Sequence, residues 1–115
     1  MGADLYLNSE FNKADPKRYK GNGYFRDSYN STSVLWKLGL SWWEDILPRV
    51  KGGYLGLSDI KWLLDEIILR KPVLNEKLSR VENKDDRNWY KYHYAELVTF
   101  LKRALEKKEA IEASL

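Results

Sequence analysis

The clearest structural pattern in the 115-residue chain is the stretch Ser58-Asp59-Ile60-Lys61-Trp62-Leu63-Leu64-Asp65-Glu66-Ile67-Ile68. Its aliphatic residues stand at positions 60, 63, 64, 67 and 68, which is the i, i+3, i+4, i+7, i+8 spacing of one helix face. Ser58 can cap this helix at its start. Pro72 ends it, because the residue before a proline is pushed out of helical geometry. The stretch therefore predicts an amphipathic helix with one buried face.

Upstream of this stretch, two shorter helices are indicated. A hydroxyl side chain among residues 31–33 can cap the first, which stops at Gly39. Ser41 and Glu44 form a capping box, in which each side chain can satisfy an amide of the other residue. Pro48 limits the helix that this box opens to about two turns. Its expected buried face is Trp43, Ile46, Leu47 and Val50.

Downstream, the helical spacing of apolar residues continues. Leu74, Leu78 and Val81 indicate a further short helix. The last helix is expected to start near residues 83–86 and to extend to about residue 112. Its final turns, Glu106-Lys107-Lys108-Glu109, have few apolar anchors and are expected to fray.

The N-terminal part of the chain has a different character. Residues 3–7 alternate loosely between apolar and polar, which is typical of a short strand or an extended arm. Residues 8–23 are polar, contain Pro16 and close on Gly21-Asn22-Gly23, which is typical of a loop that ends in a turn.

These patterns predict one domain of residues 1–115 and a mainly α fold. The expected architecture is a compact bundle of four or five helices in residues 31–115, preceded by an extended, loop-rich segment in residues 1–30. An α+β fold with a small sheet that uses Leu5-Tyr6-Leu7 is the alternative.

The amino-acid composition excludes several kinds of functional site. The chain has no cysteine, which excludes disulfides, thiolate metal sites and thiol nucleophiles and fits a reducing compartment. The start, Met1-Gly2-Ala3-Asp4-Leu5, lacks the basic and apolar regions of a signal peptide, and no apolar run approaches the length of a membrane span. We therefore expect a soluble cytoplasmic protein without a membrane partner. Its 20 basic and 17 acidic residues give a net charge of +3 that is spread thinly along the chain.

The single histidine, His93, is the first place to look for acid–base chemistry. It stands three residues before Glu96, so the two side chains can share one helix face. Two ligands are too few for a zinc site, which needs three or four. We therefore assign no catalytic residue, metal or cofactor, and interpret His93 as a packed or surface residue.

The most distinctive polar run is Arg26-Asp27-Ser28-Tyr29-Asn30. It offers a guanidinium, a carboxylate, two hydroxyls and an amide, and arginine can hold a phosphate or a carboxylate with two hydrogen bonds. The run is therefore the best candidate for binding a small anion. Asp27 and Ser28 are also typical turn and capping residues, which would explain the run without a ligand.

Large aromatic residues are unusually frequent, with 5 tryptophans among 115 residues. Trp42 and Trp43 are adjacent, so on a helix they point about 100° apart and one can reach the surface. With Trp36, they form a candidate surface for protein–protein contacts, although packing inside the domain is the commoner use of such residues.

Three hypotheses about function follow. The leading one is a small non-enzymatic protein-interaction module, with a protein partner or a second copy bound at Trp36, Trp42 and Trp43. The second is a weak nucleic-acid binder that uses the basic residues of the last helix, Lys91, Lys102, Arg103, Lys107 and Lys108. The third is a small-anion binder or enzyme centred on Arg26 and Asp27, which requires these residues to converge with His93.

Overall fold

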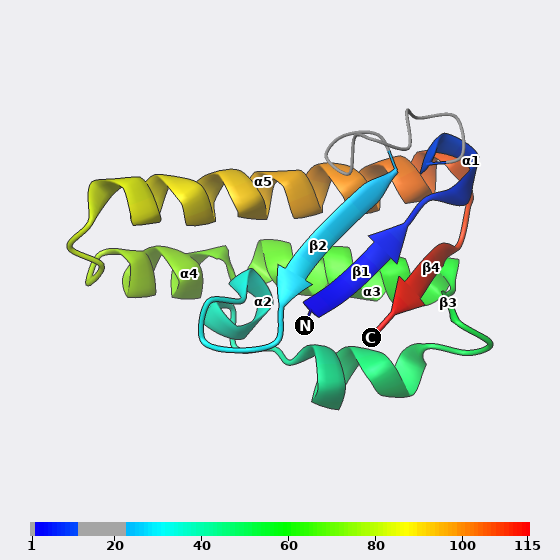
Figure 1. Cartoon of the computed structure of the whole chain (residues 1–115), viewed down its shortest axis with the longest axis horizontal. Coiled ribbons are helices and arrows are strands. Elements are labelled where there is room, and N and C mark those ends of the chain that lie inside the picture. Colours follow the sequence, from blue (N-terminus) through cyan, green and yellow to red (C-terminus); the bar gives the residue numbers. More distant parts are fainter. Residues whose placement is uncertain (1, 12–22) are drawn as a thin grey trace.

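The computed structural model describes residues 2–11 and 23–115, which form an antiparallel sheet packed on a layer of helices (Figure 1). Within these residues, the strands are β1 (Gly2–Tyr6), β2 (Tyr24–Ser28), β3 (Tyr54–Leu55) and β4 (Ile111–Ser114). The α-helices are α1 (Asn8–Phe11), α2 (Val34–Lys37), α3 (Leu57–Leu69), α4 (Lys71–Leu78) and α5 (Lys84–Lys107). Between α2 and β3 lie a π-helical turn, η1 (Trp42–Ile46), and a 3-10 turn, η2 (Leu47–Arg49).

The strand order in the sheet is β2-β1-β4-β3, and every neighbouring pair is antiparallel. The two central strands come from opposite ends of the chain, with Asp4 opposite Ser114 and Tyr6 opposite Glu112. β2 lies at one edge and pairs with β1 along its whole length. Helices α3 and α5 pack against each other behind the sheet (Figure 1). The buried side chains of both layers form one hydrophobic cluster.

The prediction of a mainly α bundle is wrong, because the sheet makes the fold α+β, the class held as the alternative. Only the segment at residues 3–7 indicated a strand, and it forms β1. The last helix ends at Lys107 instead of near residue 112, since Lys108 adopts the left-handed conformation with φ 53° and redirects the chain into β4. In β4, Ile111 and Ala113 point into the core. The strands that pair with β4 lie far away in the sequence, so no local sequence pattern predicts this strand.

The longer helices follow the sequence patterns closely. α3 spans Leu57–Leu69 and buries four of the five predicted aliphatic residues, whereas Ile68 is 48% exposed. Its N-cap is Gly56, so the expected capping by Ser58 is wrong. Pro72 lies in the first turn of α4, where a missing amide proton costs no helical hydrogen bond. α5 starts after Asn83, whose side chain accepts hydrogen bonds from the backbone amides of Asp85 and Asp86. A helix is therefore confirmed in each of these three segments, although α4 ends at Leu78, before the predicted Val81.

Of the two hydrogen bonds of the capping box predicted at Ser41 and Glu44, only one is present. The Ser41 hydroxyl accepts a hydrogen bond from the amide of Glu44 at 3.3 Å. The amide of Ser41 donates to Asp45 at 2.8 Å, where the box would have used Glu44. The turn that follows is π-helical, and in it Trp42 faces the core while Trp43 faces solvent. The buried face is thus offset from the expected one.

The predicted loop at residues 8–23 is partly helical. Residues 8–11 form α1, whereas Pro16 and Gly21-Asn22 lie outside the described residues. Gly23 has φ +83°, and a Cβ at this position would lie 2.4 Å from the backbone nitrogen of Phe11. Glycine is therefore required where the chain enters β2.

Candidate binding cleft between β2 and α5

The polar run singled out in the sequence forms β2 and the turn after it. Successive side chains of a strand point to opposite faces, so Phe25 and Asp27 enter the core while Arg26 and Ser28 stay on the outer face. Arg26 and Asp27 therefore do not converge on one anion. The guanidinium of Arg26 instead lies 3.2 Å from the carboxylate of Asp4 on β1.

The Asp27 carboxylate is buried, and both of its oxygens accept hydrogen bonds from other residues of the chain. It accepts hydrogen bonds from the hydroxyl of Ser33 at 2.7 Å and from the indole Nε1 of Trp42 at 2.8 Å. It also accepts from the backbone amides of Val34 at 3.0 Å and Leu35 at 3.2 Å, the first amides of α2. Asp27 therefore joins β2, α2 and η1, and its donors explain how a carboxylate can be buried at this point.

His93 extends this cluster to α5. Its Nε2 lies 3.4 Å from Asp27 Oδ1 and is buried, yet it is not aligned for a hydrogen bond with any described residue. The imidazole is stacked between Phe25 and Trp89, with ring centroids 4.7 Å and 4.8 Å away. These stacking contacts hold the ring in place.

The environment of Asp27 changes its acidity. Burial alone would raise the pKa of the carboxyl group, because it disfavours the charged form. The adjacent His93 ring and the hydrogen bonds described above outweigh burial and lower the pKa of Asp27 below its usual value. Asp27 is therefore held as a carboxylate, and its charge is part of the folded structure.

A cleft lies between β2 and the face of α5 that carries His93. Figure 1 shows that the N-terminal half of α5 extends past the sheet edge formed by β2. Trp89 and Tyr92 on this part of the helix are 49% and 68% exposed. The cleft is lined on the strand side by Tyr24, Phe25, Arg26, Asp27 and Ser28, and on the helix side by Trp89, Tyr92, His93, Glu96, Thr99, Phe100 and Arg103.

Among the strands that the structure describes, none pairs with the outer edge of β2, which forms the strand side of the cleft. The amide of Leu7 donates to the carbonyl of Gly23 at 2.9 Å, which makes these two residues a hydrogen-bonded pair. Hydrogen-bonded pairs alternate along antiparallel strands, so Phe25 and Asp27 bond to β1 and the backbone groups between and after them point away from it. Among the described residues, the backbone groups of Arg26 and Ser28 have no hydrogen-bond partner.

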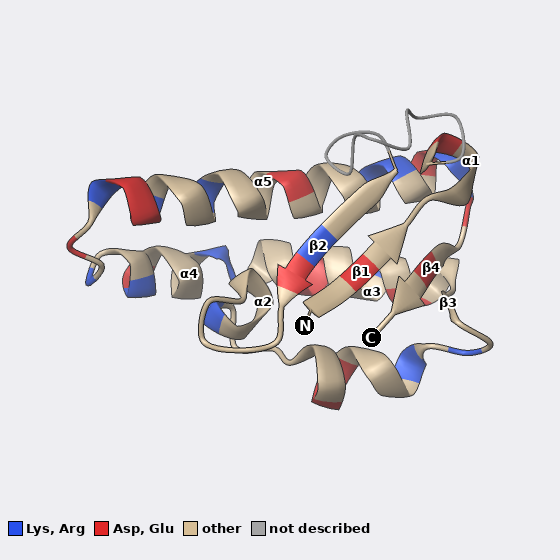
Figure 2. Cartoon of the chain, viewed as in Figure 1, with Lys and Arg blue, Asp and Glu red and all other residues tan. Residues whose placement is uncertain are grey.

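Charge at the cleft is mostly neutralised within the chain, with one exception. Arg26 pairs with Asp4, and Arg103 on α5 pairs with Glu10 at 3.3 Å. Glu96 is exposed and forms no ion pair within residues 2–11 and 23–115. Figure 2 shows acidic and basic residues interspersed along α5. Glu96 is therefore the acidic side chain on the helix wall that has no cation beside it among the described residues.

The remaining residues of the polar run serve the turn after β2. The side-chain oxygen of Asn30 accepts from the amide of Thr32 at 2.9 Å. Tyr29 packs against Trp43, with ring centroids 5.5 Å apart. Neither Tyr29 nor Asn30 lines the cleft.

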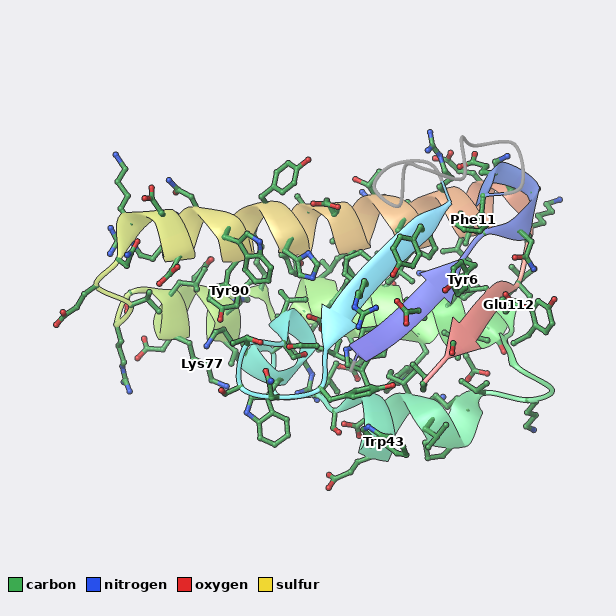
Figure 3. The ribbon with its side chains drawn as sticks, in the orientation of Figure 1. Tyr6, Phe11, Trp43, Lys77, Tyr90 and Glu112 are labelled. Atoms are coloured by element: carbon green, nitrogen blue, oxygen red, sulfur yellow. The ribbon has the colours of Figure 1, made fainter. Side chains whose placement is uncertain are left out.

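The predicted tryptophan surface is divided between core and solvent. Trp42 is 2% exposed, whereas Trp36 and Trp43 are 53% and 52% exposed. Sequence reasoning missed Trp89 and Tyr92, although they and Glu96 have the i, i+3, i+7 spacing of one helix face. Aromatic side chains also gather beside Tyr24, the first residue of β2. There the rings of Tyr6 and Phe11 meet edge to face, with centroids 5.1 Å apart (Figure 3).

Within the described ranges, no group of three or more histidine, aspartate or glutamate side chains could hold a metal ion, and no helix is long and apolar enough to cross a membrane. Comparison of the chain with models of protein families, with curated proteins and with solved structures finds no match. The cleft is therefore the feature of the chain that bears on function.

Proposed function

We propose that the chain is a small non-enzymatic protein-interaction module and that its binding site is the cleft between β2 and α5. The observation that carries the proposal is the exposure of Trp89 and Tyr92 beside an open strand edge. Exposed large aromatic residues are the usual anchors of protein–protein contacts, and an open edge offers a row of backbone hydrogen-bonding groups. The absence of cysteine favours a reducing compartment, so we place this activity in the cytoplasm.

The hydrogen bonds of Asp27 and the stacking of His93 support a binding role for the cleft over a catalytic one. Both oxygens of Asp27 already accept hydrogen bonds from the protein. His93 is clamped between two aromatic rings. A general acid or base needs freedom to reach the proton that it transfers, which this packing does not favour.

The basic residues of α5 give less support to nucleic-acid binding. Arg103 and Lys107 both pair with Glu10, at 3.3 Å and 3.0 Å. The shared carboxylate offsets one of these two positive charges and makes both cations less available to phosphate groups. We therefore favour a protein partner.

The test is selection of random linear peptides displayed on phage against the immobilised full chain. We expect enriched peptides whose affinity falls at least about tenfold for the double variant Trp89→Ala/Tyr92→Ala. The matched control is Trp36→Ala/Trp43→Ala, which removes two equally exposed tryptophans outside the cleft. Circular dichroism of each variant checks its fold. Failure to enrich any peptide, or peptides that depend on the control pair instead, would overturn the proposal.

A further inference from the structure

We propose that the partner is an extended peptide segment that adds a fifth strand to the sheet along β2 and presses a lysine or arginine side chain against Glu96. The inference rests on the proposed function, because it names the chemistry of the ligand for the same cleft. It is carried by the placement of three features in the described part of the chain: a strand edge without a neighbouring strand, two exposed rings and a carboxylate without an ion pair.

The backbone of β2 supplies the first feature. The amide and carbonyl groups of Arg26 and Ser28 point away from β1 and have no partner among the described residues. An added strand would lie about 4.8 Å from β2 and satisfy these groups in the ladder pattern. It would also continue the sheet over the part of α5 that extends past β2 (Figure 1).

The helix supplies the surface that such a strand would cover. Trp89 and Tyr92 are the exposed aromatic residues on this part of α5, and His93 lies beneath the cleft with its Nε2 buried. Every second side chain of an added strand points toward the helix. Apolar side chains at those positions would remove the two rings from water.

Glu96 sets the charge of the partner. It stands four residues after Tyr92 and seven after Trp89, so the three side chains share one face of α5. The arginines at the cleft are already paired with Asp4 and Glu10, which leaves the Glu96 carboxylate to attract a cation. Aromatic faces next to a carboxylate favour lysine or arginine, because both attract positive charge.

The experiment is a peptide array read with the full chain. The probes are acetylated, amidated peptides of the pattern Thr-x-Thr-z-Thr-x-Thr, in which x is valine, leucine or phenylalanine and z is lysine, arginine, glutamine or glutamate. The alternation places both x residues and z on one face of a strand. We expect the lysine and arginine peptides to bind at least about tenfold more tightly than the glutamate peptides.

Two sets of variants make the result specific. Glu96→Lys should reverse the preference toward the glutamate peptides, while Glu106→Lys, at an exposed position of α5 outside the cleft, should leave it unchanged. N-methylation of the peptide amides that face β2 should abolish binding, because it removes the ladder hydrogen bonds.

The possible failures are distinguishable. If phage-selected peptides require Trp89 and Tyr92 but none of the lysine or arginine peptides binds, the proposed function stands and this inference falls. This inference also falls if the Glu96→Lys variant still prefers the lysine and arginine peptides over the glutamate peptides. It falls likewise if N-methylated peptides bind as tightly as the unmethylated ones. Self-association of the chain along β2, seen by light scattering and lost on Ser28→Pro, would replace the peptide with a second copy.

Discussion

The indole Nε1 of Trp42 donates a hydrogen bond to the carboxylate of Asp27 at 2.8 Å, inside the core. This bond ties η1 to β2, and the same carboxylate accepts from the first two amides of α2. A single buried carboxylate therefore joins β2 to two short helical segments, α2 and η1. The position of the cleft wall also depends on Asp27, because its carboxylate faces His93, which lines the cleft from α5.

Replacement of Asp27 should strongly destabilise the fold. In Asp27→Ala, the hydroxyl of Ser33, the indole of Trp42 and two backbone amides lose their acceptor in a buried site. Each buried donor left unsatisfied costs about 1–3 kcal/mol, so we expect a loss of at least about 3 kcal/mol in the free energy of unfolding. Urea denaturation followed by tryptophan fluorescence measures it.

The matched control for this variant is Asp65→Ala. Asp65 forms an exposed ion pair with Lys61 at 2.7 Å, and such pairs contribute less than about 1 kcal/mol. Equal losses for the two aspartate variants would contradict the role assigned to Asp27.

Trp42→Phe should destabilise the chain more than Trp43→Phe. The first change removes the donor to Asp27 and leaves a gap in the core, for which we expect a cost of about 1–4 kcal/mol. The second changes a side chain that is 52% exposed, so we expect about 0.5 kcal/mol or less. Thermal unfolding of the two variants compares them directly, and the opposite order would refute the assignment of Trp42 to the core.

Acid should weaken the fold through Asp27. The pKa of this carboxyl group is lowered in the folded state, so the unfolded chain binds a proton first as pH falls. Its contribution to stability is complete above the ordinary aspartate pKa of 3.8 and is lost as pH falls from there through the lower folded-state value. We expect the free energy of unfolding to drop over this range, and to drop less in Asp27→Asn. An equal drop in both proteins would assign the acid sensitivity to other carboxyl groups.

The helices could be predicted from the sequence because their signals are local. The aliphatic face of α3, Pro72 at the start of α4 and the Asn83 cap of α5 each act within a few residues. The sheet could not be predicted in the same way. β3 has two residues and β4 has four, and each becomes a strand only when distant segments pair with it.

The cleft was only partly visible in the sequence. Arg26, Asp27 and His93 stood out by residue type, but the alternation of β2 sends the first two to opposite faces. Trp89 was not singled out, because its importance depends on where α5 passes the sheet edge. Long-range packing, which no local pattern records, decides which aromatic residues remain exposed.

The most direct test of the binding proposal is amide hydrogen exchange of β2, followed by NMR with and without the tightest-binding lysine peptide of the array. In the free protein, the amides of Arg26 and Ser28 should exchange much faster than those of Phe25 and Asp27, which bond to β1. The peptide should slow exchange at Arg26 and Ser28 and shift the indole resonance of Trp89. Protection of Arg26 and Ser28 in the free protein, or binding that leaves their exchange unchanged, would contradict strand addition at this edge.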